Sequence, residues 1–182
     1  MDSVLETPRL ILRQISMADL DFLAAMMTDA EVMRYYPKRY TRDEVDAWIH
    51  RQEEHYTKHG HGNWLVLDKF TCQPVGRVGL SQQMVEDVEM SEVGYMIHRP
   101  YWRQGLATEA AAATRDHAFF KLDKPRVISL VRPINLPSQG VARKIGMQPE
   151  DHLVQHGGFE HFVFAVSLEA TTSPQRQEDR IP

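Results

Sequence analysis

The stretch EVGYMIHRPYWRQGLATEA, residues 92–110, decides the fold. It reads as an apolar strand, a short loop and a helix that begins at Gly105. The first N–H groups of a helix have no partner within it and lie at the positive end of its dipole. Gly105 and Ala107 leave room for a phosphate to approach these groups, and Arg103 and Gln104 add donors. The segment predicts a diphosphate-binding cradle, and an ordinary loop with a glycine beside a helix start is the alternative.

A second stretch, RPINLPSQGVARKIGM at residues 132–147, contains another helix start. Pro137 suits the first turn of a helix, and Gly146 suits the position just after its end. Asn135 stands directly before this helix, where it can cap the first turn, and Ser138 can share in the capping. Both side chains can instead face a ligand that lies between the two helices, and the sequence leaves these interpretations open.

The rest of the chain alternates between strand-like and helix-like segments, which predicts a single mixed α/β domain. Capping-box patterns at residues 16–19 and 41–44 precede the first two helices. The expected helices cover residues 20–28, 42–59, 105–120 and 137–145. The expected strands cover residues 10–15, 64–67, 75–80, 92–97, 126–131 and 159–168, with one more between residues 146 and 159.

The composition is that of a soluble globular domain. The chain has 182 residues, 42% of them hydrophobic and 25% charged, which suits one domain. The net charge of −4 argues against a dedicated nucleic-acid binder, and no apolar run reaches the roughly 18 residues of a membrane helix. We therefore expect neither nucleic acid nor membrane as a partner. Residues 1–169 are predicted to form the domain, and the polar residues 170–182 are predicted to be a disordered tail.

Cysteine and histidine usage bears on location and on metals. The lone Cys72 has no partner for an intramolecular disulfide, and the first residues lack the apolar core of a secretory signal, so we expect a reducing, cytoplasmic location. Cys72 has no nearby histidine to activate it and is not a predicted nucleophile. His59 and His61 lie near His50 and His55, but no His-Glu-x-x-His or cysteine pattern supports a metal site, and none is predicted.

Taken in order, these segments resemble the GNAT superfamily of acetyl-CoA-dependent N-acetyltransferases. The closest resemblance is to the Rim-type subgroup, which acetylates the N-termini of ribosomal proteins. It begins with TPRLILR at residues 7–13 and continues through VGY at 93–95 and YWRQGLATEA at 101–110. It ends with Asn135-x-x-Ser138 and KIGM at 144–147. The resemblance implies a GNAT-like α/β fold, a mostly antiparallel, splayed sheet of about seven strands flanked by about four helices.

The resemblance also implies a site for acetyl-CoA. Backbone groups of Met96 and Ile97 would bind the pantetheine arm, and Asn135 and Ser138 would contact the cofactor near that arm. The diphosphate would be held by the N–H groups of the cradle, which are those of Arg103, Gln104, Gly105, Leu106, Ala107 and Thr108.

The chain departs from the family pattern at two positions. Trp102 stands where the general motif has Arg or Gln, as Rim-type members often show. Ala142 stands where many members carry a Tyr that protonates the leaving thiolate. Ser138, a water molecule or no acid at all could serve instead, because a thiolate with a conjugate-acid pKa of about 8.5–9 is a tolerable leaving group.

The implied reaction is direct acetyl transfer to a primary amine, without an acyl-enzyme. The amine must lose a proton before it attacks, and Glu92 is the predicted base; a solvated acid at a strand end is the alternative. A backbone N–H near Ile97 would stabilise the thioester oxygen. Tyr35 and Tyr36, with the loop at residues 156–159, are predicted to line the acceptor pocket; alternatively, the tyrosines cover the edge of the core.

The predicted function is therefore an acetyl-CoA-dependent N-acetyltransferase that acts on a protein N-terminus or a small-molecule amine. One alternative is an acyl-CoA-binding sensor domain without turnover, which the alanine at position 142 keeps open. Another is a structural α/β module that binds no phosphate. Family members often pair, so a homodimer is compatible with the sequence. A peptide N-terminus, an amino sugar, a polyamine and an antibiotic are the acceptor classes that the sequence leaves open.

Overall fold

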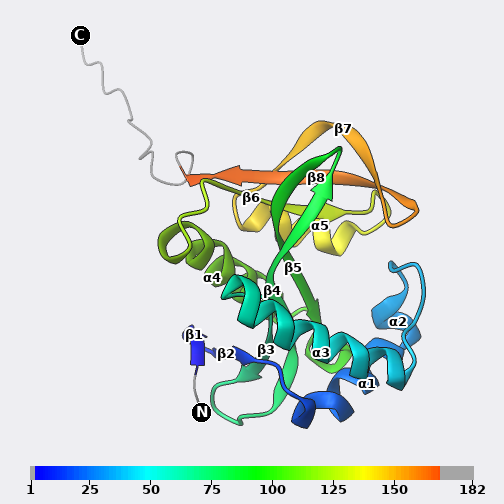
Figure 1. The fold of residues 1–182 in the computed structure, drawn as a ribbon, viewed down its shortest axis with the longest axis vertical. Coiled ribbons are helices and arrows are strands. Elements are labelled where there is room, and N and C mark those ends of the chain that lie inside the picture. The colour runs from blue at the N-terminus through cyan, green and yellow to red at the C-terminus, as the bar shows by residue number, and fades with distance from the viewer. Residues whose placement is uncertain (1–2, 169–182) are drawn as a thin grey trace.

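In the computed structural model, which describes residues 3–168, eight strands form one sheet in the order β1-β2-β3-β4-β5-β6-β8-β7 (Figure 1). Neighbouring strands are antiparallel except β5 and β6, which are parallel. The strands are β1 Ser3–Glu6, β2 Leu10–Gln14, β3 Asn63–Asp68, β4 Pro74–Val85, β5 Val88–Ile97, β6 Arg126–Val131, β7 Gln148–His156 and β8 Phe159–Ser167. The predicted tail at 170–182 lies outside the described residues.

Helices cover both faces of the sheet (Figure 1). On one face lie α4 and α5, and on the other lie α1, α2 and α3. No helix among residues 3–168 is long and apolar enough to cross a membrane. The helices are α1 Leu20–Thr28, α2 Ala30–Met33, α3 Arg42–His59, α4 Leu106–Lys121 and α5 Leu136–Lys144, with 3₁₀ turns η1 Met17–Asp19 and η2 Arg99–Tyr101.

The fold confirms the mixed α/β class and corrects two counts. The sheet has eight strands where about seven were expected, because β1 is only four residues long and ends directly before Thr7-Pro8. There are five α-helices where about four were expected, because α2 is a single turn of four residues. Elements this short carry too few residues to show a hydrophobic period.

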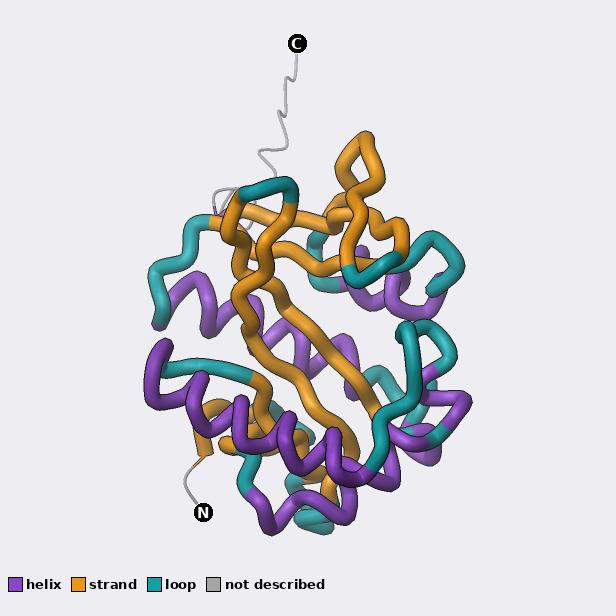
Figure 2. Tube along the Cα trace, turned by 45° about the vertical axis from the view of Figure 1, so that its right-hand side comes forward, coloured by secondary structure: helices purple, strands orange, loops and turns teal. Residues whose placement is uncertain are grey.

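The β4–β5 hairpin is longer than its apolar residues indicate. Strands were predicted over 75–80 and 92–97, but the ladder continues through polar residues to the pair Val85 and Val88. The turn between them consists of Glu86 and Asp87, which both have positive φ, as a two-residue hairpin turn requires. The extra length carries the hairpin diagonally across the molecule (Figure 2).

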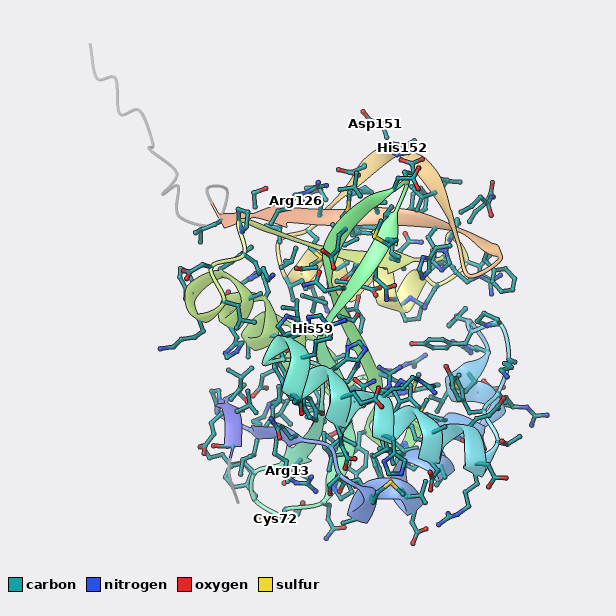
Figure 3. All side chains as sticks on the ribbon, viewed as in Figure 1. Arg13, His59, Cys72, Arg126, Asp151 and His152 are labelled. Atoms are coloured by element: carbon teal, nitrogen blue, oxygen red, sulfur yellow. The ribbon has the colours of Figure 1, made fainter. Side chains whose placement is uncertain are left out.

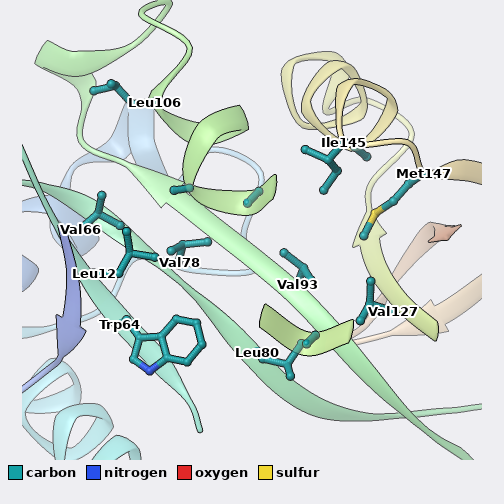
Figure 4. Packing of buried hydrophobic residues seen from close by; sticks show 14 of the residues in the cluster. Leu12, Trp64, Val66, Val78, Leu80, Val93, Leu106, Val127, Ile145 and Met147 are labelled. Atoms are coloured by element: carbon teal, nitrogen blue, oxygen red, sulfur yellow. The ribbon is translucent and has the colours of Figure 1, made fainter. Parts of the chain in front are cut away.

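Two hydrophobic clusters lie on opposite faces of the sheet. The cluster beneath α4 and α5 is built around Trp64, Val78 and Val93 (Figure 4). The cluster beneath α1, α2 and α3 includes Trp48 and Met96. Small residues let α4 lie close to β4 and β5, and the fully buried ones are Ala110, Ala111, Thr114 and Ala118.

Candidate active site

The sheet opens between β5 and β6. These parallel strands pair at a single position, Glu92 with Ile128. Just beyond it, side chains replace the missing strand partners: Ser129 Oγ donates to the Val93 carbonyl at 2.7 Å, and the Leu130 N–H donates to Glu92 Oε1 at 3.2 Å. The strands then separate (Figure 2). We call the gap that begins at Glu92 the β5–β6 opening.

Alternate residues of β5 turn their backbone toward this opening. The His98 N–H donates to the Val75 carbonyl at 2.9 Å, and with the strand register this makes Arg77 and Met96 a hydrogen-bonded pair. The backbone of Met96 therefore faces β4. Met96, one of the two residues predicted to bind the pantetheine arm through the backbone, therefore does not present its backbone to the opening. The backbone groups of its neighbours Tyr95 and Ile97 face the opening instead.

Only part of the Ile97 backbone is available there. Its carbonyl accepts a hydrogen bond from Trp102 Nε1 at 2.6 Å. Trp102 thereby connects the end of β5 to the loop before α4. The N–H of Ile97 and both backbone groups of Tyr95 have no cross-strand partner among the described residues. They offer donors and an acceptor to an extended, amide-containing chain.

The predicted cradle lies at the start of α4, beyond the end of β5. Gly105 precedes the helix with φ 79°, and a Cβ built there would come no nearer to another atom than 3.4 Å from Arg9 Nη2. The fold thus needs glycine for its backbone conformation and not for internal space. No side chain caps the helix, and the Glu109 N–H is the first to bond within it, to the Gly105 carbonyl.

The cradle residues differ in what they expose. Arg103, Gln104 and Gly105 are exposed, whereas the Leu106 side chain is buried in the core. The N–H groups of Leu106, Ala107 and Thr108 belong to the first turn and have no acceptor within the helix. Uncapped donors at a positive helix end are able to bind an anion, and diphosphate binding by these residues stays a prediction.

A contact between distant parts of the chain fixes the position of this helix start. Thr7 Oγ1 donates to Glu109 Oε1 at 2.6 Å, and Arg9 Nε donates to Glu109 Oε2 at 2.6 Å. Arg9 Nη1 also donates to the Gln104 carbonyl at 2.9 Å. Burial alone would raise the pKa of Glu109, but these hydrogen bonds outweigh it and lower the pKa. We call Thr7, Arg9 and Glu109 the N-terminal clamp. Residues 7–13 and 101–110 carry part of the family resemblance, but the contact between them was not predicted.

Asn135 and Ser138 lie at the start of α5, on the α4–α5 side of the opening. Asn135 Oδ1 accepts the Ser138 N–H at 3.2 Å, so Asn135 is the N-cap of this helix. Ser138 Oγ donates to the Tyr95 hydroxyl at 3.0 Å, and that hydroxyl donates to the Ser138 carbonyl at 2.8 Å. Burial raises the pKa of Tyr95, against the bond with Ser138, which lowers it. Ala142 is fully buried.

Glu92 occupies the narrow end of the opening. Besides the Leu130 N–H, its carboxylate accepts hydrogen bonds from Gln83 Nε2 at 2.8 Å and from Ser81 Oγ at 3.4 Å. It is half-buried rather than solvated. Glu92 thus links β4, β5 and β6 by hydrogen bonds at the point where β5 and β6 separate. Its role as a base stays a prediction.

The two predicted acceptor tyrosines have different surroundings. The carbonyl of Tyr35 accepts from Arg132 Nη1 at 3.1 Å, and the Arg132 guanidinium lies 3.9 Å from the Phe159 ring centroid. Arg132 thereby links the α2–α3 loop to the β7–β8 turn, the two segments predicted to line the acceptor pocket. The Tyr35 ring itself packs against the Arg34 guanidinium at 4.6 Å.

Tyr36 is partly open to solvent, with 38% of its surface exposed. Burial raises the pKa of its phenol, the positive charge of Arg77 lowers it, and the negative charge of Glu92 raises it. Tyr36 therefore lies within electrostatic reach of both residues, on the sheet face that they share. We call this region, where the acceptor pocket is predicted, the acceptor cleft.

Two other features lie apart from this site. Cys72 is exposed in the β3–β4 turn, at the end of the molecule opposite Arg126 and His152 (Figure 3). His59 lies at the end of α3, with its ring centroid 5.5 Å from that of His55 and 6.1 Å from that of His61. Within residues 3–168, no three His, Cys, Asp or Glu side chains are grouped as metal ligands.

Comparison with known proteins identifies the family. The family model described as an acetyltransferase (GNAT) domain matches residues 9–148. The chain belongs to the GNAT acetyltransferase family. The Bacillus subtilis protein YkkB is 36% identical over 148 residues, 79% of this chain and 84% of the relative. The B. subtilis N-acetyltransferase YoaA is 28% identical over 158 residues, 86% and 89% of the two chains.

Solved acetyltransferase structures share the fold. An acetyltransferase from Agrobacterium tumefaciens is 25% identical with a TM-score of 0.79, over 91% of this chain and 94% of that one. RimL, a ribosomal L7/L12 α-N-protein acetyltransferase in complex with coenzyme A, is 15% identical with a TM-score of 0.73, over 93% and 99%. Spermidine N-acetyltransferase from Vibrio cholerae, in complex with CoA and spermine, is 17% identical with a TM-score of 0.74, over 92% and 100%. These last two likenesses concern the fold alone.

Proposed function

We propose that this GNAT enzyme transfers an acetyl group from acetyl-CoA directly to a primary amine. The observation that carries the proposal is that the short segment at residues 98–105 joins the β5–β6 opening to the uncapped start of α4. One offers unpaired backbone groups to an amide-containing arm, and the other offers free N–H donors to a diphosphate. Both features of coenzyme A thus find matching groups on neighbouring parts of the chain.

The residues present fit this cofactor, which supplies an acetyl group activated as a thioester. The N–H groups of residues 103–108 would hold the diphosphate, with the Arg103 side chain adding positive charge. The backbone of Tyr95 and Ile97 would bind the arm, and the Ile97 N–H would donate to the developing negative charge on the carbonyl oxygen. Asn135 would support the site as the cap of α5, next to Ser138.

Proton movement is assigned to two side chains. Glu92 would accept the proton of the attacking amine, because its carboxylate stands at the end of the opening and on the same sheet face as the acceptor cleft. The Ser138 hydroxyl, which is paired with Tyr95, would donate toward the leaving thiolate. The amine itself would enter through the cleft that Tyr36 lines.

The role of Glu92 can be tested by Glu92→Gln. We expect the rate to fall by about 100-fold near neutral pH, the lower end of typical base catalysis, with acetyl-CoA affinity retained. The loss should shrink at high pH, where the amine is deprotonated without help. The matched control is Glu89→Gln, an exposed acid on the same strand. An unchanged pH–rate profile in a folded Glu92→Gln protein would remove Glu92 as the base.

The proposed function is tested by binding and then by turnover. In a thermal-shift panel, acetyl-CoA and CoA should stabilise the protein and ATP and NAD should not; a ligand at 100 times its dissociation constant adds about 2.7 kcal/mol. Amines are then screened by release of free thiol. Binding without turnover of any amine would favour the acyl-CoA sensor, and no binding would favour the structural module.

Three finer assignments belong to this proposal. The Rim-type subgroup, with a protein N-terminus as acceptor, rests on the sequence resemblance, and a small-molecule amine is the other acceptor class. The cytoplasmic location rests on the lone Cys72. The homodimer stays a prediction, which sedimentation of the purified chain would test.

A further inference from the structure

Half-buried arginines in this protein fall into two groups. Arg13, Arg115 and Arg126 each contact a carboxylate, at Asp19, Asp116 and Glu150 respectively. Arg77 and Arg132 contact none of the carboxylates among the described residues. A guanidinium is costly to remove from water without an anionic partner. Both unpaired arginines border the acceptor cleft, through Tyr36 and Tyr35.

Arg77 has unused hydrogen-bond donors on its guanidinium group. Its Nη1 donates to Asn63 Oδ1 at 2.6 Å, and its guanidinium lies 5.1 Å from the centroid of the Trp48 ring. Its Nε is buried with no hydrogen-bond partner, and its Nη2 donates to no described residue. A guanidinium has five N–H donors in a fork that matches a carboxylate. Neutral contacts thus hold the guanidinium in place and leave donors of the fork unused.

The strand register places Arg77 beside the reacting centre. Arg77 is directly opposite Met96 on the neighbouring strand, so its side chain projects from the same face as those of Met96 and Glu92. Opposite Cα atoms in such a hydrogen-bonded pair lie about 5.5 Å apart. Arg77 therefore stands one strand away from the Tyr95–Ile97 edge, on the sheet face that also carries Glu92.

The carboxylate of Glu92, the predicted base, has only neutral hydrogen-bond partners among the described residues. Glu92 is held by Gln83, Ser81 and the Leu130 N–H, and it does not reach Arg77. Arg132 adds a second unpaired positive charge where the two loops meet. Two guanidinium charges against the single carboxylate of Glu92 therefore favour an anionic acceptor over a polycation.

We propose that Arg77 binds a carboxylate of the acceptor, so that the substrate is an amine with a carboxylate group close to it. This inference rests on the proposed function. The class includes free amino acids and short peptides with an acidic residue near the N-terminus, which share this chemistry. It excludes polyamines and neutral amines as preferred acceptors. Arg77 acts as a specificity residue and takes no part in proton transfer.

The test compares acceptors that differ only in the carboxylate. The purified protein is supplied with acetyl-CoA and with matched pairs of amino acids and amino acid amides, and with peptides that begin in Asp or Asn; spermidine is the polycation. We expect kcat/KM to be about 30- to 100-fold higher for each acid than for its amide, as for a desolvated charge pair. A comparison of kcat/KM for free amino acids with kcat/KM for the peptides that begin in Asp distinguishes the two sources of the carboxylate.

The variant Arg77→Met retains an unbranched apolar stem over Trp48 and removes the charge. Its acid-to-amide preference should disappear through a higher KM for the acid, while kcat at saturating acid and acetyl-CoA affinity are kept; Arg77→Lys should restore part of the preference. Arg51→Met, on the exposed side of α3, is the control. The inference would be overturned if amides or spermidine were used as well as or better than the acids, or if the preference for acids survived in Arg77→Met. Neither result would contradict the proposed acetyltransferase activity. No thiol release with any amine would refute the proposed function itself.

Discussion

The helices α3 and α4 begin in opposite ways. Thr41 and Glu44 form a reciprocal capping box at the start of α3: Thr41 Oγ1 accepts the Glu44 N–H at 3.2 Å, and Glu44 Oε2 accepts the Thr41 N–H at 2.8 Å. At the start of α4 stands Gly105, which has no side chain and leaves the first-turn donors free. Uncapped helix starts cost stability, so the contrast fits the proposal that the start of α4 binds a ligand, whereas the start of α3 is satisfied within the fold.

The N-terminal clamp extends this contrast. The start of α3 is satisfied by its own neighbours in sequence, whereas the start of α4 is held by residues about a hundred positions away. Thr7 and Arg9 bind the Glu109 side chain and the Gln104 carbonyl, and they leave the N–H groups untouched. The helix start is thus fixed in position without being capped, which is the arrangement that a preorganised anion site needs.

The largest expected effect comes from filling the cradle. Gly105→Trp should weaken acetyl-CoA binding at least 100-fold, measured by calorimetry, because the ring would occupy the space in front of the free N–H groups. Gly60→Trp is the matched control, since Gly60 also has positive φ and open space around its Cβ, at the end of α3. Equal loss in both variants, or normal binding by Gly105→Trp, would contradict the cradle.

The next effect concerns the clamp. Glu109→Gln should lower the free energy of unfolding by about 1–2 kcal/mol at pH 7, through weaker bonds to Thr7 and Arg9, and should weaken acetyl-CoA binding a few-fold. The folded-state pKa of Glu109 is lowered, so its contribution is present above its unfolded pKa of about 4.3 and is lost as the pH falls through the folded value. Urea unfolding should therefore show a smaller difference between Glu109→Gln and the unmodified protein at pH 3 than at pH 7. A difference that grew at low pH would contradict this assignment.

The smallest effect separates the two interpretations of Asn135. If its main role is the N-cap of α5, Asn135→Ala should lower stability by about 1 kcal/mol and change acetyl-CoA affinity by less than about threefold, or 0.65 kcal/mol. Thr41→Ala should cost a similar amount with no change in affinity, and both are measured by urea unfolding and calorimetry. A tenfold loss of affinity confined to Asn135→Ala would make Asn135 a ligand of the cofactor.

Local sequence signals predicted much of the fold. The capping boxes at Ser16 and Thr41 placed two helix starts, and the apolar run at 126–131 placed a strand to the residue. The missed elements, β1 and α2, are four residues each. Strand β1 pairs with β2, and α2 is a single turn whose first N–H groups are capped by the Asp29 side chain. The extra length of β4 and β5 was missed because polar side chains line that part of the ladder.

The candidate site was predicted unevenly for a related reason. The α4 start is encoded by adjacent residues, so the sequence placed Gly105 directly before the helix; diphosphate binding by Gly105 and its neighbours stays a prediction. The backbone direction of Met96 depends on the strand register, and the partners of Glu92 come from β4 and β6; neither is visible in a single segment. Arg77 drew no attention in the sequence because its lack of a carboxylate partner is a property of the folded chain alone.

The most direct test of the account follows the backbone amides as acetyl-CoA is added. In ¹⁵N–¹H spectra of the titrated protein, the amides of Gly105, Leu106, Ala107 and Thr108 should show the largest shifts, while those of residues 42–44 at the start of α3 stay unchanged. That result would show that the uncapped helix start is the diphosphate site. If the amide signals of residues 105–108 do not shift at saturating acetyl-CoA, or if the amides at both helix starts shift equally, the result contradicts this assignment.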